Sequence, residues 1–350
     1  TRPEALIQNI DYAPTFLDIT GTPIPASAKF QGRSILPALK DTSKVPDGWR
    51  DAIYYTYYGE NTHNVAPHDG VRTAAHKLMY FPATKEWNLI DLVKDPDEMR
   101  SFHDDPAYAS VLADMTGRYH ALRKHYGVSS ATIPVDRFKQ DWWSKRHKEK
   151  TNLAKKGGYD LAFIGDSITH AFERAGGGGH DVWAKYYAPR NAINLGYGGD
   201  RTQHVLYRLQ RGEWQNARPK VAVLMIGTNN TGHTQQDPDE TAQGIRLILD
   251  HIADRSPETK TLLLGVFPRG ATPEDKLRKI NVAINDRIAK FHDGDKVHFL
   301  DISDKFLTED GTLPKDIMPD LLHPNANGYQ IWADAIEPTL AKLGGWPTIK

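Results

Sequence analysis

The 350-residue sequence carries 44 basic (Lys and Arg) and 44 acidic (Asp and Glu) residues, so its formal net charge is zero, and 39% of its residues are hydrophobic. These proportions are ordinary for a globular protein of one or two domains, and the balanced charge gives no general attraction to nucleic acid or to an anionic membrane. The absence of cysteine excludes disulfides, thiolate metal sites and cysteine nucleophiles. No apolar run is long enough to span a membrane. Because Thr1 is preceded by neither an initiator Met nor an apolar signal segment, we expect a mature or trimmed chain, which leaves a removed export signal open.

The first third of the chain predicts a small α+β module. Apolar residues at helical spacing predict a helix over residues 4–18, which Pro14 should kink, and a loop rich in proline follows. Extended and aromatic patterns predict strands over residues 52–58, 70–81 and 87–92. A helical pattern over residues 108–126 completes a module that we place at residues 1–127.

The motifs of this module are more specific than its pattern. It contains Asn-Ile-Asp-Tyr-Ala-Pro-Thr at residues 9–15, Gln-Gly-Arg-Ser-Ile-Leu at 31–36, Gly-Val-Arg-Thr at 70–73, Leu-Ile-Asp-Leu at 89–92 and Asp-Pro-Asp-Glu at 95–98. On these motifs the module closely resembles the C-terminal subdomain of sulfatases. The chain has neither the Cys/Ser-x-Pro-x-Arg motif nor the acidic calcium site that the resemblance would require for sulfate hydrolysis. We therefore expect either a piece of a longer fusion whose N-terminal sulfatase domain is missing here, or an appendage that packs against or positions a substrate.

Two features of the first half admit binding roles. His63 and His68 lie in a polar loop and could reach a ligand, although a solvated loop is the favoured explanation. After a linker at residues 128–135 comes a helical pattern with aromatic residues on one face and the basic residues 145–148 on another. An amphipathic helix with a solvated face explains this pattern better than nucleic-acid binding does, so we expect no nucleic-acid partner.

Residues 136–350 alternate predicted strands and helices. Apolar runs predict strands at residues 161–164, 192–195, 221–226, 261–266 and 297–300, and helical patterns lie at residues 202–211, 241–254, 277–291 and 325–343. Such alternation predicts a parallel sheet with helices on both faces. Since ligands bind at the carboxyl ends of the strands in such sheets, the residues directly after the strands are the candidates for a functional site.

These candidates fit ester hydrolysis, which needs a nucleophilic hydroxyl, a base with an orienting partner, and donors for the oxyanion. We predict Ser167 as the nucleophile, His323 as the base and Asp320 as the orienting carboxylate. The backbone N–H groups of Ser167 and Gly199 and the side-chain amide of Asn229 are the predicted oxyanion donors. Each of these residues alone could equally be a turn residue or a helix cap, and only the whole set in this order favours catalysis.

The blocks that carry these residues resemble those of the SGNH (GDSL-type) hydrolase superfamily. They read Gly-Asp-Ser at residues 165–167, Gly-Asp at 199–200, Gly-Thr-Asn at 227–229 and Asp-Leu-Leu-His-Pro at 320–324. Residues 194–206 and 225–230 look most like the platelet-activating-factor acetylhydrolase branch, which shares Asn at position 230 where many members have Asp. The resemblance covers about residues 134–350 and implies an α/β, flavodoxin-like fold with a five-stranded parallel sheet, and no metal or cofactor.

Other side chains near the blocks are expected to have supporting roles. Asp200 should order the oxyanion loop, and three histidines are expected at the surface or at the rim of the substrate site: His170, His204 and His233. Four aromatic residues could stack on a sugar ring, although packing in the core is the favoured explanation: Trp183, Tyr186, Tyr187 and Tyr197.

Together these observations predict a serine esterase acting on short-chain acyl, and favour acetyl, esters. A carbohydrate alcohol is the favoured leaving group, because sulfatases and bacterial esterases similar to this branch both act on polysaccharides. A phospholipid acetylhydrolase or lipase is the alternative enzyme. A carbohydrate-binding protein with a vestigial site, or the C-terminal part of a bifunctional sulfatase-esterase, is the alternative of another class. The expected partner is an acylated small molecule or polysaccharide, and a periplasmic or secreted location is favoured if the protein is bacterial.

Overall fold

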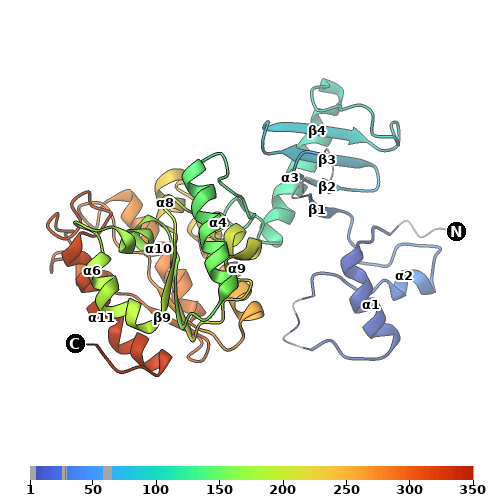
Figure 1. Cartoon of the computed structure of the whole chain (residues 1–350). Coiled ribbons are helices and arrows are strands. Elements are labelled where there is room, and N and C mark those ends of the chain that lie inside the picture. The colour runs from blue at the N-terminus through green and yellow to red at the C-terminus, as the bar shows by residue number, and fades with distance from the viewer. Residues whose placement is uncertain (1–4, 26–27, 29, 58–64, 350) are drawn as a thin grey trace. The chain divides into compact units, whose positions relative to one another are not determined.

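A computed structural model describes residues 5–25, 28, 30–57 and 65–349. The chain divides into two compact units, Thr1–Tyr126 and Gly127–Lys350. Figure 1 shows the first unit in blue and cyan and the second in green to red. Each unit is described separately below.

Unit 1 is built on a four-stranded antiparallel sheet with the order β1-β2-β3-β4. The strands are β1 (Ile53–Tyr57), β2 (His68–Arg72), β3 (His76–Phe81) and β4 (Glu86–Asp91). The helices are η1 (Asn9–Asp11), α1 (Tyr12–Ile19), α2 (Leu36–Lys40), η2 (Pro106–Tyr108) and α3 (Ala109–His125), of which α3 contacts β1, β2 and β3.

Two expectations for unit 1 were wrong in detail. Residues 70–81 form parts of two strands, because Thr73 turns the chain: its N–H donates to the carbonyl of His76 and its hydroxyl accepts from the His76 N–H. The helix predicted over residues 4–18 forms an α-helix only from Tyr12, so Pro14 lies in its first turn, where a missing N–H leaves no hydrogen bond unmade. His63 lies outside the described residues. His68 is part of β2 and packs its ring 5.1 Å from that of Phe81.

Buried carboxylates in unit 1 are fully paired. Asp69 accepts from the hydroxyls of Tyr54 and Tyr119 and from Arg123. Asp11 accepts two hydrogen bonds of 2.7 Å from the Arg50 guanidinium. The Asp69 contacts tie α3 to β2, and the Asp11 contacts tie η1 to the segment before β1. A buried charge is tolerated only where it is paired.

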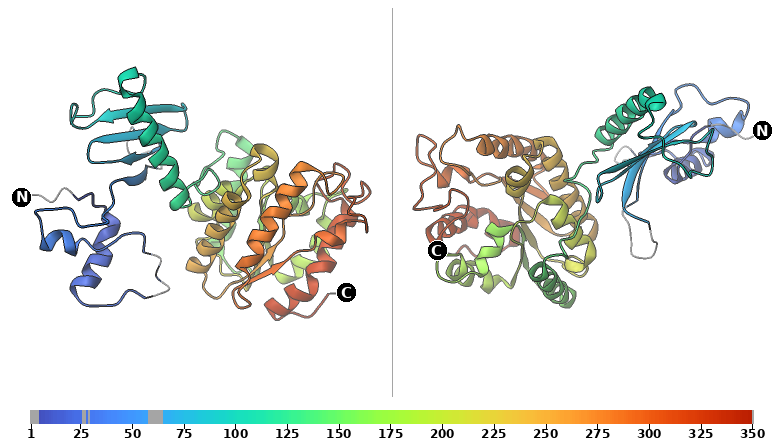
Figure 2. Two further views of the ribbon diagram at one scale, coloured as in Figure 1. Left: turned by 180° about the vertical axis from the view of Figure 1, so that it is seen from behind. Right: turned by 90° about the horizontal axis from the view of Figure 1, so that it is seen from above.

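Unit 2 contains a five-stranded parallel sheet with the order β6-β5-β7-β8-β9, which confirms the predicted flavodoxin-like architecture. The strands are β5 (Leu161–Gly165), β6 (Ala192–Gly196), β7 (Val221–Met225), β8 (Lys260–Leu264) and β9 (Val297–Leu300). Figure 2 shows the helices on both faces of this sheet. They are α4 (Asp141–Lys156), α5 (Ser167–His170), η3 (Ala171–Glu173), α6 (His180–Val182), η4 (Trp183–Tyr187), η5 (Ala188–Arg190), α7 (Thr202–Arg208), η6 (Leu209–Glu213), α8 (Thr228–Thr234), α9 (Pro238–Arg255), α10 (Lys276–Ile288), η7 (Ala289–Phe291), η8 (Ser303–Phe306) and α11 (Ala326–Gly344).

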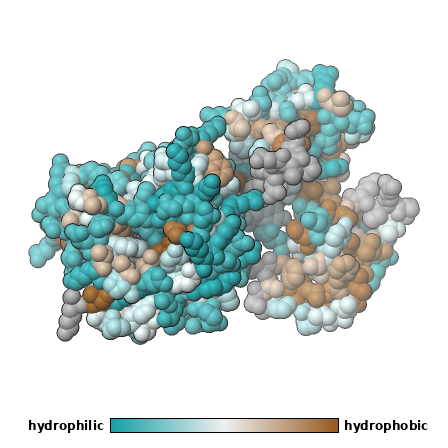
Figure 3. Space-filling model, viewed as in Figure 1, coloured by the Kyte–Doolittle hydropathy of each residue, from teal (hydrophilic) through white to brown (hydrophobic). Residues whose placement is uncertain are grey.

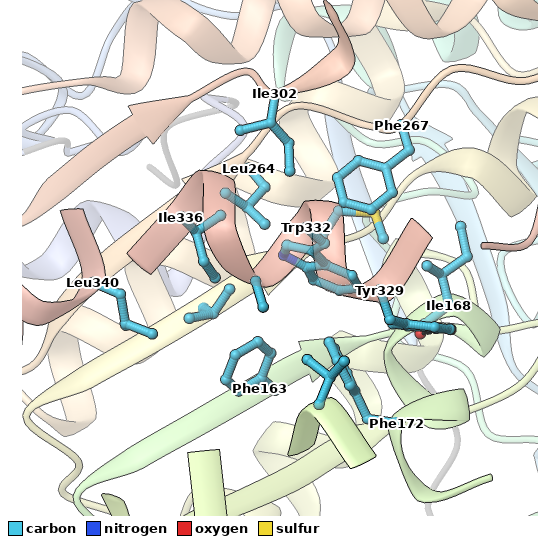
Figure 4. Close-up of a cluster of buried hydrophobic side chains, with 14 of the residues drawn as sticks. Phe163, Ile168, Phe172, Leu264, Phe267, Ile302, Tyr329, Trp332, Ile336 and Leu340 are labelled. Carbon is cyan, nitrogen blue, oxygen red and sulfur yellow. Dashed lines mark hydrogen bonds between the residues drawn. The ribbon is translucent and has the colours of Figure 1, made fainter. Parts of the chain in front are cut away.

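Alternating strand residues feed two separate cores, one on each face of the sheet. Leu161 and Phe163 point to the face covered by α11, where they join an aromatic cluster around Trp332 (Figure 4). Ala162 and Ile164 point to the opposite face, covered by α7, α9 and α10. Burial also accounts for the four aromatic residues considered above for sugar stacking. Tyr186, Tyr187 and Tyr197 are buried, and Trp183 packs against the α11-side core.

Residues 128–135, which we expected to be a linker, lie in unit 2. Ala131 is buried there, and its carbonyl accepts from the Thr202 hydroxyl at 2.8 Å. The Val135 N–H donates to the carbonyl of Gln203 at 3.3 Å. This segment is therefore packed on the start of α7, next to the loop that follows β6.

Candidate active site

Ser167 lies where the first strand of the parallel sheet turns into a helix. The strand ends at Gly165, and Asp166 caps α5 by accepting from the Ile168 N–H at 3.0 Å. A side chain at Gly165 would meet the Met225 carbonyl oxygen at 2.6 Å, so glycine is required for the close approach of β5, β7 and the new helix. This sharp turn places the Ser167 hydroxyl at the carboxyl edge of the sheet, 2.9 Å from Nε2 of His323.

The segment before α11 brings His323 and Asp320 together. Oδ2 of Asp320 lies 2.7 Å from Nδ1 of His323. Oδ1 accepts from the backbone N–H groups of Leu322 and His323 at 3.1 and 2.7 Å, and Leu321 adopts a positive φ of 60° to close this tight turn. Partial burial acts to raise the pKa of Asp320, but the backbone and ring N–H groups of His323 outweigh it, so the pKa lies below its ordinary value. Asp320 is therefore an anion suited to holding the imidazole.

Arg278, which the sequence analysis did not single out, helps to hold this turn in place. Arg278 of α10 donates to the carbonyls of Arg269 and Gly311 at 2.9 and 2.5 Å, and also to that of Gly270. The Gly270 N–H in turn donates to the Leu321 carbonyl at 3.0 Å. Arg278 thus connects the loop after β8 with the segment that carries Asp320.

The loop after β6 is ordered by a buried carboxylate. Gly199 has a φ of 72°, and Asp200 directly follows it with its side chain fully buried. One oxygen of Asp200 accepts from Trp143 Nε1 and from Arg137, each at 2.9 Å, and the other accepts from Arg208 Nε at 2.8 Å. These three hydrogen bonds support the expected role of Asp200 in ordering the loop. The partners could not be found from the motif, because they come from α7, α4 and the segment before α4.

Asn229 lies at the start of α8, directly after the strand β7. Its side-chain Nδ2 donates to the Asp200 carbonyl at 3.0 Å, which ties α8 to the loop that carries Gly199. The next residue, Asn230, accepts from the Thr202 N–H and donates to Gln236 at 2.9 Å. Because a carboxylate cannot donate, asparagine at this position serves both contacts.

The three histidines near the motifs differ in their surroundings. His204 is buried rather than at the surface, and its Nδ1 accepts from the Arg201 N–H at 3.0 Å. Burial and the neighbouring charge of Arg201 lower its pKa to about 3. Burial and the charge of Arg146 lower the pKa of His170 to about 4. Only His233 is exposed, so it alone fits the expected position at a rim.

Asp166 is the most strongly perturbed carboxyl group beside the serine. It is fully buried, and its Oδ2 has no hydrogen-bond partner among the described residues. Burial, with a smaller contribution from the charge of Asp200, raises its pKa to about 7.

The part of the chain that the structure describes contains no group of three His, Asp or Glu side chains placed to hold a metal ion. It also contains no helix long and apolar enough to cross a membrane.

Comparison with known proteins gives a separate match for each unit. Residues 163–331 match the GDSL-like lipase/acylhydrolase family, and residues 1–132 match the C-terminal region of N-sulphoglucosamine sulphohydrolase. The platelet-activating factor acetylhydrolase IB subunit alpha1 of Homo sapiens is 34% identical over 218 residues, which span 61% of this chain and 90% of that subunit.

Two solved structures extend the comparison. Axe2, an acetylxylan esterase from Geobacillus stearothermophilus, is 19% identical and aligns over 55% of this chain and 97% of its own, with a TM-score of 0.44. The BT4656 protein, solved with its substrate D-glucosamine-2-N,6-O-disulfate, is 35% identical over 34% of this chain and 24% of its own, with a TM-score of 0.32. The N-terminal part of the chain is a module similar to the C-terminal region of sulfatases. Because nine-tenths of an acetylhydrolase subunit aligns at 34% identity with the remainder, the chain belongs to the GDSL-like lipase/acylhydrolase family.

Proposed function

We propose that this protein is a serine esterase that removes short acyl groups, favouring acetyl, from carbohydrate alcohols. The observation that carries the proposal is the continuous chain of contacts from the Ser167 hydroxyl to Nε2 of His323 at 2.9 Å and from Nδ1 to Asp320 at 2.7 Å. A serine is a weak nucleophile until a base within hydrogen-bonding reach accepts its proton.

In this proposal, the Ser167 hydroxyl attacks the ester carbonyl while His323 takes its proton. Asp320 keeps the imidazole proton on Nδ1 and stabilises the imidazolium that forms. The N–H groups of Ser167 and Gly199 and the free hydrogen of the Asn229 amide donate to the oxyanion. His323 then protonates the leaving alcohol, and a water activated by the same imidazole releases the acid from the acyl-enzyme.

Two observations support the acetyl group and the carbohydrate. The relatives at 34% identity are named as acetylhydrolases, which supports a small acyl group. The match of unit 1 to N-sulphoglucosamine sulphohydrolase supports a carbohydrate leaving group. The same relatives favour one alternative, a phospholipid acetylhydrolase, in which the acyl group is shared and the alcohol differs.

The test is a substrate panel measured with the wild type and Ser167→Ala. The panel contains p-nitrophenyl acetate and butyrate, an acetylated xylo-oligosaccharide and an acetyl phospholipid, and Ser43→Ala in unit 1 serves as the control because Ser43 is exposed. We expect Ser167→Ala to lower acetate release by about 10³-fold or more and Ser43→Ala to leave it unchanged. Turnover that survives Ser167→Ala would favour a binding protein with a vestigial site, and preference for the phospholipid would favour the alternative enzyme.

The module in unit 1 favours a second candidate, a bifunctional sulfatase-esterase of which this sequence is a part. It would require a separate domain with the Cys/Ser-x-Pro-x-Arg motif, which this sequence lacks. Sequencing of the gene upstream of Thr1 tests this directly. Sulfate release by the 350-residue chain alone would contradict it, since no formylglycine precursor is present.

A further inference from the structure

Arg201 differs from the other arginines around the candidate active site. Arg137 and Arg208 are both bound to Asp200, and Arg269 donates to the Thr228 carbonyl at 2.7 Å. The half-buried guanidinium of Arg201 makes no hydrogen bond or ion pair with any residue that the structure describes, and its Nε is shielded from solvent without a partner. Burial and the charge of Arg137 lower the pKa of Arg201. Buried donors are normally paired, so an arginine left in this state is placed to receive an external acceptor.

The position of Arg201 ties it to the reaction centre. It follows Asp200, whose carbonyl is bound by Asn229, and its own N–H is held by His204 at 3.0 Å. The backbone of Arg201 is therefore fixed two residues beyond Gly199, one of the proposed oxyanion donors. A long side chain from this point can reach a substituent next to the ester.

The carboxylates near Arg201 form ion pairs with other arginines. Asp200 is neutralised by Arg208 and Arg137, and Glu213 by Arg208. On the α8 side, the Arg269 guanidinium lies 2.6 Å from where a side chain on Gly232 would begin, one residue before the exposed His233. Burial and the charges of Arg201, Arg137 and Arg269 together lower the pKa of His233, so these three cations gather around one place, which favours an anionic ligand.

An exposed aromatic ring lies on the other side of the same loop. Trp142 of α4 is 42% exposed, and its Cη2 lies 3.8 Å from where a side chain on Gly198 would begin. Its ring stacks with that of His170 at 6.2 Å and 20°, and the Arg137 guanidinium carbon lies 5.6 Å from its centroid. A large aromatic surface kept exposed beside polar groups is suited to packing against the apolar face of a sugar ring.

From these contacts we propose that Arg201 binds a carboxylate or sulfate on the substrate and that Trp142 packs against a sugar ring beside it. The substrate class is then an acetyl ester of an anionic carbohydrate. This inference rests on the proposed function, since it names the substrate of the same site. Guanidinium groups bind carboxylate and sulfate oxygens by the same paired N–H donors, and the two sources are separated below by experiment.

The experiment compares kcat/KM for acetate release from three acetylated oligosaccharides: a neutral xylo-oligosaccharide, an oligogalacturonate and a sulfated glucosamine oligosaccharide. The variants are Arg201→Gln and Arg201→Lys, with Arg255→Gln as the matched control. Arg255 is exposed and precedes β8, so it lies at the opposite edge of the sheet. We expect the wild type to prefer one anionic substrate over the neutral one, and Arg201→Gln to reduce that ratio about tenfold, the effect of losing one charged hydrogen bond. Arg201→Lys should keep part of the preference, and Arg255→Gln should keep all of it.

Two further measurements keep the inference testable if Arg201→Gln does not fold. The anionic preference of the wild type should nearly vanish in about 1 M NaCl, where the screening length is about 3 Å. Trp142→Ala should raise KM for all three oligosaccharides about three- to tenfold, whereas Trp142→Phe should raise it less. Two results would overturn this inference alone, provided that the wild type hydrolyses acetyl esters through Ser167. The wild type could show no preference for an anionic substrate, or its preference could be insensitive both to salt and to Arg201→Gln. Absence of Ser167-dependent hydrolysis of every acetyl ester overturns the proposed function instead.

Discussion

The two units of this chain treat buried charge differently. In unit 1, Asp11 and Asp69 are each held by an arginine and by further donors. Unit 2 also pairs buried charge, as Arg208 does with Asp200 and Glu213, but in addition Asp166 has an unpaired buried oxygen and Arg201 an unpaired buried nitrogen, both next to proposed catalytic groups. Paired buried charge therefore builds the architecture of both units, while the unpaired buried charge of unit 2 marks a place where a substrate or a proton is expected.

The units also differ in where their apolar side chains lie. Unit 2 buries its strands between two cores, whereas unit 1 exposes apolar residues along α1: Tyr12, Phe16 and Ile19 are 50%, 65% and 56% exposed. Figure 3 shows hydrophobic residues gathered over the α1 and α2 region of unit 1. An exposed apolar patch of this kind is typical of an interaction surface. All of the proposed catalytic groups lie in unit 2, and unit 1 holds none of them.

The sharpest test of this contrast is His323→Ala. Without a base, ester hydrolysis should fall about 10³-fold or more, because serine and histidine act as one unit. The measurement is acetate release under substrate saturation, together with the fluorescence unfolding curve. The control His103→Ala changes a partly exposed residue of unit 1 and should leave the rate unchanged. Equal losses in both variants would contradict the assignment of the reaction to unit 2.

A matched pair of arginine variants compares architectural charge in the two units. Arg208→Met removes the buried partner of Asp200 and Glu213, and Arg50→Met removes that of Asp11. Each should destabilise its own unit by about 3–5 kcal/mol, measured by urea unfolding, because one buried charge is left unpaired. Only Arg208→Met should also lower ester hydrolysis, since Asp200 orders the loop with Gly199. If Arg50→Met lowers hydrolysis equally, the contrast between the units is wrong.

Asp166→Asn tests the unpaired carboxyl group through pH. Between the ordinary value of 3.8 and the folded value of about 7, the folded protein holds a proton that the unfolded chain has lost. The stability of the wild type should therefore fall as pH rises across this range. Each pKa unit is worth about 1.4 kcal/mol, so Asp166→Asn should gain up to about 4 kcal/mol over the wild type between pH 4 and pH 8. Thermal unfolding at both pH values measures this, and a pH-independent difference would count against a raised pKa.

Asn229→Ala is expected to have the smallest effect of the four. Loss of one oxyanion donor should lower kcat by about 10²- to 10³-fold with little change in KM. Asn216→Ala is the control, because the Asn216 amide is exposed and donates only to the Lys155 carbonyl within the described residues. A rate loss that appears mainly in KM would indicate that Asn229 binds substrate rather than the transition state.

The parallel architecture of unit 2, the sulfatase-like nature of unit 1 and the set of proposed catalytic residues could all be predicted from the amino-acid sequence. Strand and helix periodicity is a local property, and the residues directly after parallel strands necessarily share one edge of the sheet. Ser167 and Asn229 could therefore be placed at one edge before any coordinates, whereas His323 was predicted from the Asp-Leu-Leu-His-Pro motif that precedes the last helix. The turn at Thr73 was missed because the apolar pattern continues on both sides of it.

The surroundings of those residues could not be predicted, because they depend on how the whole chain packs. The partners of Asp200 come from three segments whose side chains meet through packing, and no spacing in the sequence encodes their distance. Burial likewise depends on the whole fold: His204 was expected near the surface and is enclosed, while Trp142 keeps an exposed ring beside Gly198. The unpaired state of Arg201 is visible only when every neighbouring donor and acceptor is in place, because a missing partner is a property of the assembled structure.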